Sequence, residues 1–408
     1  MYPDLTGCHV WIMLTRSGLS SNAEDIENTQ GVGPPAGFER MKRSTDRILT
    51  THTGSLPRPD DLVELLYADE AGKITGRTAF DRRVREAVAE SVRKQIDVGL
   101  DVVNDGETGK VSYSTYVSSR LTGYEGHVNV PRRPRPDAAA FPDYAEWNAK
   151  QQQGAQRIKR YACTGPVRYV GHEALRRDIA NLKAALEDVK VTEAFMTAAS
   201  PGVISVFQPN QYYPGNEEYL SALADAMREE YEAIHKAGFL LQLDCPDLSG
   251  MSTAEQPGEK PADLALRVEA LSHAVANIPP DRMRLHLCWG NYEGPHHLDT
   301  PLQEIIGEVL KARPAGVSFE GANPRHEHEW NVFERVKLSD GKVIIPGVLD
   351  STTNFIEHPE LVAQRIVRYA RLVGRENVIA GTDCGFGTFA GTPMVHPSIA
   401  FAKLRSMA

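Results

Sequence analysis

The chain has few cysteines and no long hydrophobic run, and both absences narrow its class. Its five cysteines are scattered over 408 residues, which argues against a disulfide framework. No stretch approaches the ~18 consecutive apolar residues of a membrane span. The short apolar run 10–14 lacks the preceding basic residues of a signal peptide. We therefore expect a cytoplasmic protein that does not contact a membrane.

The chain also lacks a strong excess of positive or negative charge. The formal net charge is −9, and no long segment carries charges of one sign. A nucleic-acid-binding surface would need a basic patch or stripe, so we expect no nucleic-acid partner. The composition, with 41% hydrophobic and 24% charged residues, is typical of a globular protein with a large core.

Short apolar segments alternate with helical patterns along most of the chain. Strands are expected at 48–51, 100–103, 195–197, 239–243, 285–290, 316–319, 343–348 and 378–381, and helices at 78–98, 173–187, 217–237, 262–277, 301–311, 359–373 and 397–406. Alternating strands and helices require parallel pairing, and eight such units close most simply as an α/β fold, the (β/α)8 or TIM barrel. A doubly wound open sheet is the alternative, but no Gly-rich phosphate-binding turn follows the first strand.

The remaining segments define the domain organisation. Residues 1–45 are polar and aperiodic, so we expect a loosely ordered N-terminal extension. Residues 46–408 are expected to form one catalytic barrel with an insertion at 123–170. Within it, the proline-rich run Pro131–Pro136 argues against a helix or a central strand, and residues 164–167 are expected to form a hairpin.

The fifth predicted strand carries the first half of a candidate metal site. Its sequence is Leu-His-Leu-Cys-Trp-Gly at 285–290, and residues two apart on a strand point to the same face. His286 and Cys288 therefore project together. Zinc accepts both ligand types and prefers about four ligands in a tetrahedron.

Chemically active residues recur where the predicted strands end. These residues are Ser55, Glu107, Asp244, His286, Cys288, Glu320, Asp350 and Cys384. The carboxyl ends of barrel strands converge on one mouth, where barrel enzymes place their chemistry. We therefore predict a zinc ion on His286, Cys288 and Cys384, with Glu320 as the fourth or exchangeable ligand.

Other residues of these types have plainer interpretations. Glu320 can instead cap the following helix, and Asp383 can either orient a ligand or serve a turn. The remaining candidates are assigned to packing (Cys163 and Cys245) or to solvated surface and the substrate rim (His296, His297, His326 and His328).

Two thiolates, one imidazole and one weak ligand indicate a catalytic zinc site. Such a site can bind a substrate thiol, remove its proton near neutral pH and leave a usable nucleophile. Glu107 and Asp244 can hold the ammonium group of an amino-thiol substrate, although either can also pair with an arginine structurally. Hydrolysis by zinc-bound hydroxide is the alternative chemistry, which more often uses histidine and carboxylate ligands.

Several segments together resemble the catalytic barrel of cobalamin-independent methionine synthases and the single-barrel proteins related to them, over about residues 46–405. The matching segments are His52-Thr53-Gly54-Ser55-Leu56-Pro57, Asp105-Gly106-Glu107, Leu243-Asp244-Cys245-Pro246, His286-Leu287-Cys288, Phe319-Glu320, Pro346-Gly347-Val348-Leu349-Asp350 and Gly381-Thr382-Asp383-Cys384-Gly385. The resemblance implies zinc bound at His286, Cys288, Glu320 and Cys384. It also implies contacts with a thiol substrate at Ser55, Glu107 and Asp244.

The resemblance also implies an activity. We expect a zinc-dependent S-methyltransferase or S-alkyltransferase that activates homocysteine or a similar thiol as a zinc thiolate, with catalytic roles for Glu107 and Asp244. The expected partners are a small-molecule thiol and a methyl or alkyl donor. Methionine synthases of this family have a histidine shortly after the segment that matches Asp350, whereas here no histidine occurs before His358.

Two other functions stay open. The chain is also similar to epoxyalkane:coenzyme M transferase in its single-barrel size and in its His-x-Cys motif followed by a distant cysteine. That enzyme opens an epoxide with a zinc-bound thiolate. A non-catalytic zinc-binding or thiol-carrier protein is the alternative from another class, and turnover with any electrophile would eliminate it.

Overall fold

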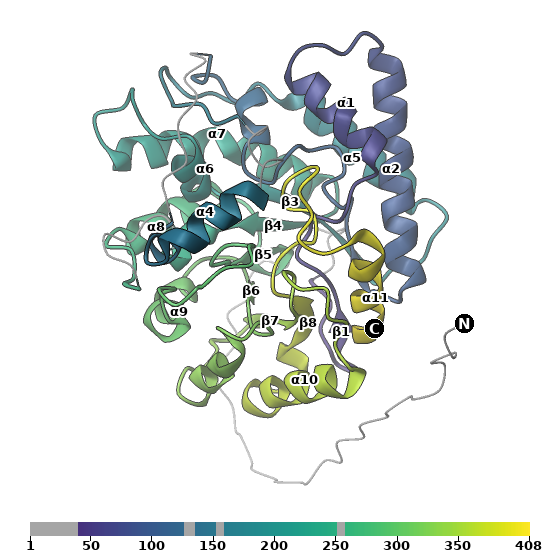
Figure 1. Ribbon diagram of the computed structural model, residues 1–408, viewed down its shortest axis with the longest axis vertical. Helices are drawn as coiled ribbons and strands as arrows, with labels where there is room; N and C mark the ends of the chain where they lie inside the picture. Colours follow the sequence, from purple (N-terminus) through teal and green to yellow (C-terminus); the bar gives the residue numbers. More distant parts are fainter. Residues whose placement is uncertain (1–39, 126–134, 152–158, 251–257) are drawn as a thin grey trace, which may run out of the picture. The chain divides into compact units, whose positions relative to one another are not determined.

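Eight parallel β-strands form the centre of the protein in a computed structural model, which describes residues 40–125, 135–151, 159–250 and 258–408 (Figure 1). The strands are β1 (Leu49–Thr50), β2 (Val102–Val103), β3 (Glu193–Ala199), β4 (Leu240–Asp244), β5 (Met283–His286), β6 (Gly316–Phe319), β7 (Val343–Leu349) and β8 (Ile379–Thr382). They pair in the order β1-β8-β7-β6-β5-β4-β3-β2, which confirms the predicted (β/α)8 barrel. Most of the predicted extension, residues 1–39, lies outside the described residues.

Helices connect the successive strands. The α-helices are α1 (Asp60–Glu70), α2 (Arg77–Asp97), α3 (Pro136–Ala139), α4 (Pro142–Gln151), α5 (His172–Leu186), α6 (Pro201–Phe207), α7 (Asn216–Lys236), α8 (Leu264–Ala274), α9 (Leu302–Val309), α10 (Pro359–Val373) and α11 (Pro397–Met407). Short 3-10 helices are η1 (Tyr116–Ser119), η3 (Pro246–Ser249), η4 (Pro280–Arg282), η5 (Glu327–Glu334) and η6 (Arg375–Asn377). Among the described residues, no helix is both long and apolar enough to cross a membrane.

Asp101, one residue before β2, joins the edge strands β1 and β2. Its N–H donates to the carbonyl oxygen of Thr50 (3.1 Å), and its carboxylate accepts from the N–H (2.9 Å) and the hydroxyl (3.1 Å) of Thr50. Arg47 donates to the same carboxylate (2.7 Å). These contacts hold the first strand beside the second and so close the barrel.

Apolar side chains from opposite sides of the sheet meet inside the barrel. One buried cluster contains Leu49, Val102, Phe195, Leu240, Val343, Ile345 and Ile379, which come from β1, β2, β3, β4, β7 and β8. Above them, Arg284 of β5 reaches across the interior to donate to the Thr51 hydroxyl (3.0 Å) and the His52 carbonyl oxygen (2.6 Å), both just after β1. The barrel is therefore packed, and its chemistry belongs at the mouth.

The positions of the long elements follow the sequence patterns closely. The predicted β6 (316–319) and α10 (359–373) agree with the structure at both ends. Four α-helices were not predicted: α1, α3, α4 and α6. The prediction that the proline-rich run contains no helix is wrong at its last residue. Pro136 begins α3, and at the first position of a helix the missing N–H of proline is not needed. Residues 131–134 lie outside the described residues.

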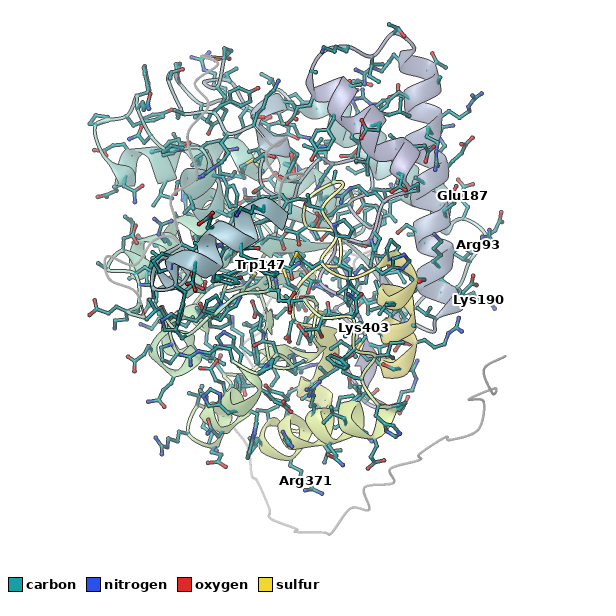
Figure 2. The ribbon with its side chains drawn as sticks, in the orientation of Figure 1. Arg93, Trp147, Glu187, Lys190, Arg371 and Lys403 are labelled. Carbon is teal, nitrogen blue, oxygen red and sulfur yellow. The ribbon has the colours of Figure 1, made fainter. Side chains whose placement is uncertain are left out.

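The predicted hairpin at 164–167 is wrong. The segment instead runs beside residues 120–123: Thr164 N–H donates to the Gly123 carbonyl oxygen (2.8 Å), and Thr122 N–H donates to the Arg168 carbonyl oxygen (2.9 Å). Its pairing partner is thus distant in the sequence, so no local turn pattern could indicate it. In the same insertion, Tyr144 of α4 donates to the Glu293 carbonyl oxygen (2.6 Å), and Figure 2 shows Trp147 on that helix.

We predict that Asp101→Ala lowers the free energy of unfolding by about 2 kcal/mol, because the buried Thr50 N–H would lose its acceptor. Urea denaturation followed by circular dichroism measures the loss. Asp97→Ala, which removes an exposed carboxylate at the end of α2, should change the same quantity by less than about 0.5 kcal/mol. Equal losses in the two variants would contradict the role of Asp101 in closing the barrel.

Candidate metal centre and active site

Three of the four predicted zinc ligands meet at the barrel mouth. His286, Cys288 and Cys384 are buried, and their ligand atoms all lie within 4.8 Å of one another. The Sγ atoms of Cys288 and Cys384 are 3.6 Å apart. One detail of the prediction is wrong: β5 ends at His286, so Cys288 lies in the following loop and not on the strand.

The His286 imidazole has the protonation state of a metal ligand. Burial and then the Arg284 guanidinium lower the pKa of His286 to about 3, so the ring is neutral near pH 7. Its Nδ1 lies 3.2 Å from the Ser318 hydroxyl. Its buried Nε2 has no hydrogen-bond partner within the described part of the chain. A neutral imidazole with one free nitrogen suits metal binding.

The paired thiols point to the same conclusion. The shared hydrogen bond with Cys384, followed by burial, raises the pKa of Cys288 well above its ordinary value. Two thiolates at this distance repel each other in a buried site, and a divalent cation would offset that repulsion. Two thiolates and one imidazole also match the ligand types of catalytic zinc sites.

Glu320, the fourth predicted ligand, lies outside this three-residue group. Its Oε1 accepts from the Trp289 N–H (2.8 Å), and its Oε2 accepts from Asn323 Nδ2 (2.7 Å). The bond from Trp289 holds this carboxylate next to Cys288, and burial and then Cys288 raise the pKa of Glu320 well above its ordinary value. No side-chain cap is found at the start of η5, so Glu320 does not cap that helix.

Asp383 organises the loop that carries Glu320. Its carboxylate accepts from the N–H groups of Gly321, Ala322 and Asn323, each at 2.8 Å, and from Asn323 Nδ2 (2.9 Å). Asn323 Nδ2 thus contacts both Asp383 and Glu320. Of the two interpretations considered above, the structure favours an orienting residue, because Asp383 ties the end of β8 to the loop after β6.

Glu107 and Asp244 form a second buried feature of the mouth. Burial raises the pKa of both carboxyl groups, and for Asp244 the neighbouring Glu107 is the second cause. Gln242 donates to Asp244 Oδ1 (2.8 Å), and Thr197 donates to Glu107 Oε1 (3.0 Å). Glu107 Oε2 has no hydrogen-bond partner among the residues that the structure describes.

The nearest cations are bound elsewhere. Lys110 Nζ donates to the Thr197 carbonyl oxygen (2.8 Å) and lies 4.3 Å from the centre of the Tyr116 ring. Arg58 donates to the Glu107 backbone carbonyl (2.9 Å) and not to its carboxylate. Neither Glu107 nor Asp244 forms an ion pair within 4.0 Å in the described chain, so the structural arginine pairing considered above is not observed.

Ser55 lies in the loop between β1 and α1, against the loop that carries Cys384. The Phe386 N–H donates to the Ser55 carbonyl oxygen (2.8 Å). A Cβ atom added to Gly385 would collide with the Ser55 hydroxyl, so this close approach requires glycine. Ser55 therefore lies beside the loop that carries Cys384.

A cavity of about 340 Å³ opens beside Glu320. Its lining comes from the loops after β5, β6 and β7 and includes Gly290, His296, Glu320, Arg325 and Asp350. Glu320, whose carboxylate accepts from the N–H of Trp289 next to Cys288, is thus shared between the cavity and the loop that carries this thiol.

The predictions for the remaining candidates are partly confirmed. Cys163 and Cys245 are fully buried in the main core cluster, which confirms their assignment to packing. His297 and His328 are exposed, and His296 lines the cavity.

His326 was assigned wrongly to the surface. It is 2% exposed and stacks on Trp289, with ring centroids 4.2 Å apart. Its Nδ1 lies 2.7 Å from Glu329, and its Nε2 lies 3.2 Å from Asp299. Burial alone would lower its pKa, but these two carboxylates raise the pKa of His326 to about 10. The contacts join separate loops, so the local polar sequence could not indicate them.

We predict that His326→Ala destabilises the protein by about 3 kcal/mol, because Glu329 would lose its cation and Asp299 would lose one of its two histidine partners. Thermal and urea unfolding measure the loss, and His328→Ala on the same 3-10 helix is the exposed control. Because the folded pKa lies above the ordinary 6.5, this stabilisation is complete below about pH 6.5 and is lost as the pH rises through about 10. A pH-independent difference between wild type and variant would contradict the charged pair.

Comparison with known proteins relates the chain to one family. Residues 214–407 match the model of the family described as "Cobalamin-independent synthase, Catalytic domain". The chain is 23% identical over 372 residues to a methionine synthase of Pyrococcus furiosus, a match that covers 88% of this chain and 90% of that one. It is 25% identical over 385 residues to the uncharacterized Bacillus subtilis protein YxjH, with 91% and 95% covered.

A solved structure has the same fold. It is a B12-independent methionine synthase from Shewanella sp. W3-18-1 in complex with selenomethionine, with a TM-score of 0.64, 19% identity, and coverage of 88% of this chain and 95% of that one. That structure shows the fold, while the family match over residues 214–407 and the curated relatives support membership of the cobalamin-independent methionine synthase family.

Proposed function

We propose that the protein is a zinc-dependent S-methyltransferase or S-alkyltransferase that activates a substrate thiol, with homocysteine as the first candidate. The observation that carries the proposal is the buried group of His286, Cys288 and Cys384. Its sulfur-rich donor set favours thiol activation over hydrolysis, which more often uses histidine and carboxylate ligands.

Each residue of the proposed zinc site has a distinct part. His286 would bind through Nε2, while the hydroxyl of Ser318 accepts from Nδ1–H and holds the ring. Glu320 is proposed as the fourth or exchangeable ligand, since its bonds to neighbouring residues keep its carboxylate beside Cys288. A bound zinc ion would supply a Lewis acid that lowers the pKa of the substrate thiol.

Glu107 and Asp244 are proposed to hold the ammonium group of the thiol substrate. Their carboxyl groups are buried, Glu107 raises the pKa of Asp244, and neither group forms an ion pair within 4.0 Å in the described chain. An ammonium group between them would stabilise both carboxylates and replace the missing cation. Fixing the substrate in this way also orients its sulfur for attack. Ser55 is proposed to contact the same substrate from the side of Cys384.

The cavity beside Glu320 is proposed as the site of the methyl or alkyl donor. It lies between the loops after β5, β6 and β7, and Glu320, the proposed fourth ligand, lines it. In the transfer step, the substrate sulfur forms a bond to the carbon of the donor as the bond from that carbon to its leaving group breaks. The electron pair of the broken bond departs with the leaving group.

Opening of an epoxide by coenzyme M is the second candidate function. It is favoured by the segment after β7, which lacks the histidine of related methionine synthases. There, the hydroxyls of Thr352 and Thr353 donate to Asp350 (2.9 and 2.6 Å). The carboxylates of Glu107 and Asp244 argue against it, because they would repel the sulfonate of coenzyme M.

We predict that Cys384→Ser lowers zinc affinity by more than about tenfold, because a thiolate ligand is replaced by a neutral hydroxyl. Competition with a chromogenic chelator measures the affinity. Cys163→Ala removes a buried cysteine outside the group and should retain near-stoichiometric zinc. Equal affinity in the Cys384→Ser variant and the wild type would contradict the proposed site.

We predict that homocysteine binds the zinc-loaded protein and releases more protons than methionine, since methionine carries the same ammonium and carboxylate groups but no thiol proton. Calorimetry in two buffers of different ionisation enthalpy measures this difference. The additional proton release should disappear in Cys384→Ser. Binding of coenzyme M without homocysteine would move the function to epoxide opening. Binding of neither thiol would overturn thiol transfer.

A further inference from the structure

The Asn291 side chain lines the cavity and reaches the loop that follows β8. Its Nδ2 donates to the Gly385 carbonyl oxygen (2.7 Å) and to the Thr388 hydroxyl (2.7 Å). Its Oδ1 accepts from the Ser351 hydroxyl (2.9 Å). A carbonyl oxygen only accepts, so the atom that faces Gly385 is the nitrogen, which fixes the orientation of the amide. One side chain therefore joins the loops after β5, β7 and β8.

The loop that carries Asn291 also contacts two of the proposed zinc ligands. The Gly290 N–H donates to Cys288 Sγ (3.2 Å), and the Trp289 N–H donates to Glu320 Oε1 (2.8 Å). Backbone donors of this kind stabilise a thiolate and orient a carboxylate ligand. The four consecutive residues 288–291 thus supply one ligand, a donor to that ligand, a donor to a second ligand, and the amide of Asn291.

The Asn291 amide extends these contacts to the loop of Cys384. Gly385, whose carbonyl oxygen accepts from Asn291, follows Cys384 directly in the chain. The Thr382 hydroxyl donates to the Cys384 carbonyl oxygen (2.9 Å), but Thr382 belongs to the same strand end and cannot set the distance to Cys288. Asn291 comes from the loop of Cys288, so its amide can set this distance.

We propose that Asn291 is a positioning residue of the metal centre: its amide holds the loop of Cys384 against the loop of Cys288 and so sets the spacing of the two thiolate ligands. This inference rests on the proposed function, because it concerns the same zinc site. Asn291 is not a ligand of that site, so it acts through Cys384. Because its amide also lines the cavity and bonds to Ser351, the cavity wall and the metal centre share one side chain.

The first test measures zinc affinity by competition with a chromogenic chelator. Asn291→Ala removes the amide without adding charge, and we expect it to lower zinc affinity about tenfold, the lower end of the range for groups that orient metal ligands. Asn377→Ala is the matched control and should keep the wild-type affinity. Asn377 is also half-buried and donates to a backbone carbonyl oxygen, that of Val373 (2.7 Å), but it precedes β8, whereas Cys384 follows it.

The second test reads the ligand geometry from the visible spectrum of the cobalt-substituted protein, which a loss of stability alone does not shift. We expect shifted bands in Asn291→Ala and wild-type bands in Asn377→Ala. Asn291→Asp keeps an acceptor for the Ser351 hydroxyl but cannot donate to the Gly385 carbonyl oxygen, so its bands should shift as well. The spectrum is the measurement for this variant, because an added carboxylate by itself attracts a cation.

Wild-type cobalt spectra in both Asn291 variants would overturn the proposal, whatever their zinc affinity. An equal loss of affinity in Asn291→Ala and Asn377→Ala would also overturn it, because the loss would then come from removing any such bond and not from the metal centre. If the wild-type protein binds neither zinc nor cobalt, the proposed function itself fails, which distinguishes the two failures.

Discussion

Buried charge is the constraint on which the barrel mouth depends. Two thiols and several carboxyl groups share this space, where burial raises the pKa of Glu107, Asp244 and Glu320. Beneath them lies the guanidinium of Arg284, bonded to Gln242 (2.6 Å) and to residues after β1. Such an arrangement is expensive unless cations arrive to offset it. A metal ion at the thiols and an ammonium group at the carboxylates are cations of the required kind.

Contacts between loops hold this mouth in shape before any ligand binds. The Thr53 hydroxyl donates to the Thr382 carbonyl oxygen (3.0 Å), which ties the loop after β1 to the end of β8. Asp383 ties the end of β8 to the loop after β6 through three backbone N–H groups. A Cβ atom on Gly347 would collide with the Asp383 carboxylate, so this packing requires glycine there. A site fixed in this way loses little entropy when its ligands bind.

The success of the fold prediction has a physical explanation. The strands are buried on both faces, so they appear in the sequence as short apolar runs, and the long helices repeat their apolar residues at helical spacing. The helices that were missed lack a comparable signal. Helix α6 is short and follows β3 after one residue, and α4 lies in the insertion with its Trp147 exposed (58%). Cys288 was placed on a strand because the alternation of apolar and polar residues continues beyond His286, where the hydrogen-bonded pairing of β5 ends.

The sequence by itself determined the barrel and the residue types that gather at its mouth, because strand ends can be located from apolar patterns and parallel strands end on one side. The sequence could not show which buried polar atoms form hydrogen bonds. The commitment of both Glu320 oxygens to Trp289 and Asn323, the burial of His326 against Trp289, and the bond from Asn291 to the Gly385 carbonyl oxygen all depend on contacts between distant loops. Hydrogen bonding and burial depend on distances of a few ångströms between segments far apart in the chain, and only the tertiary structure sets those distances.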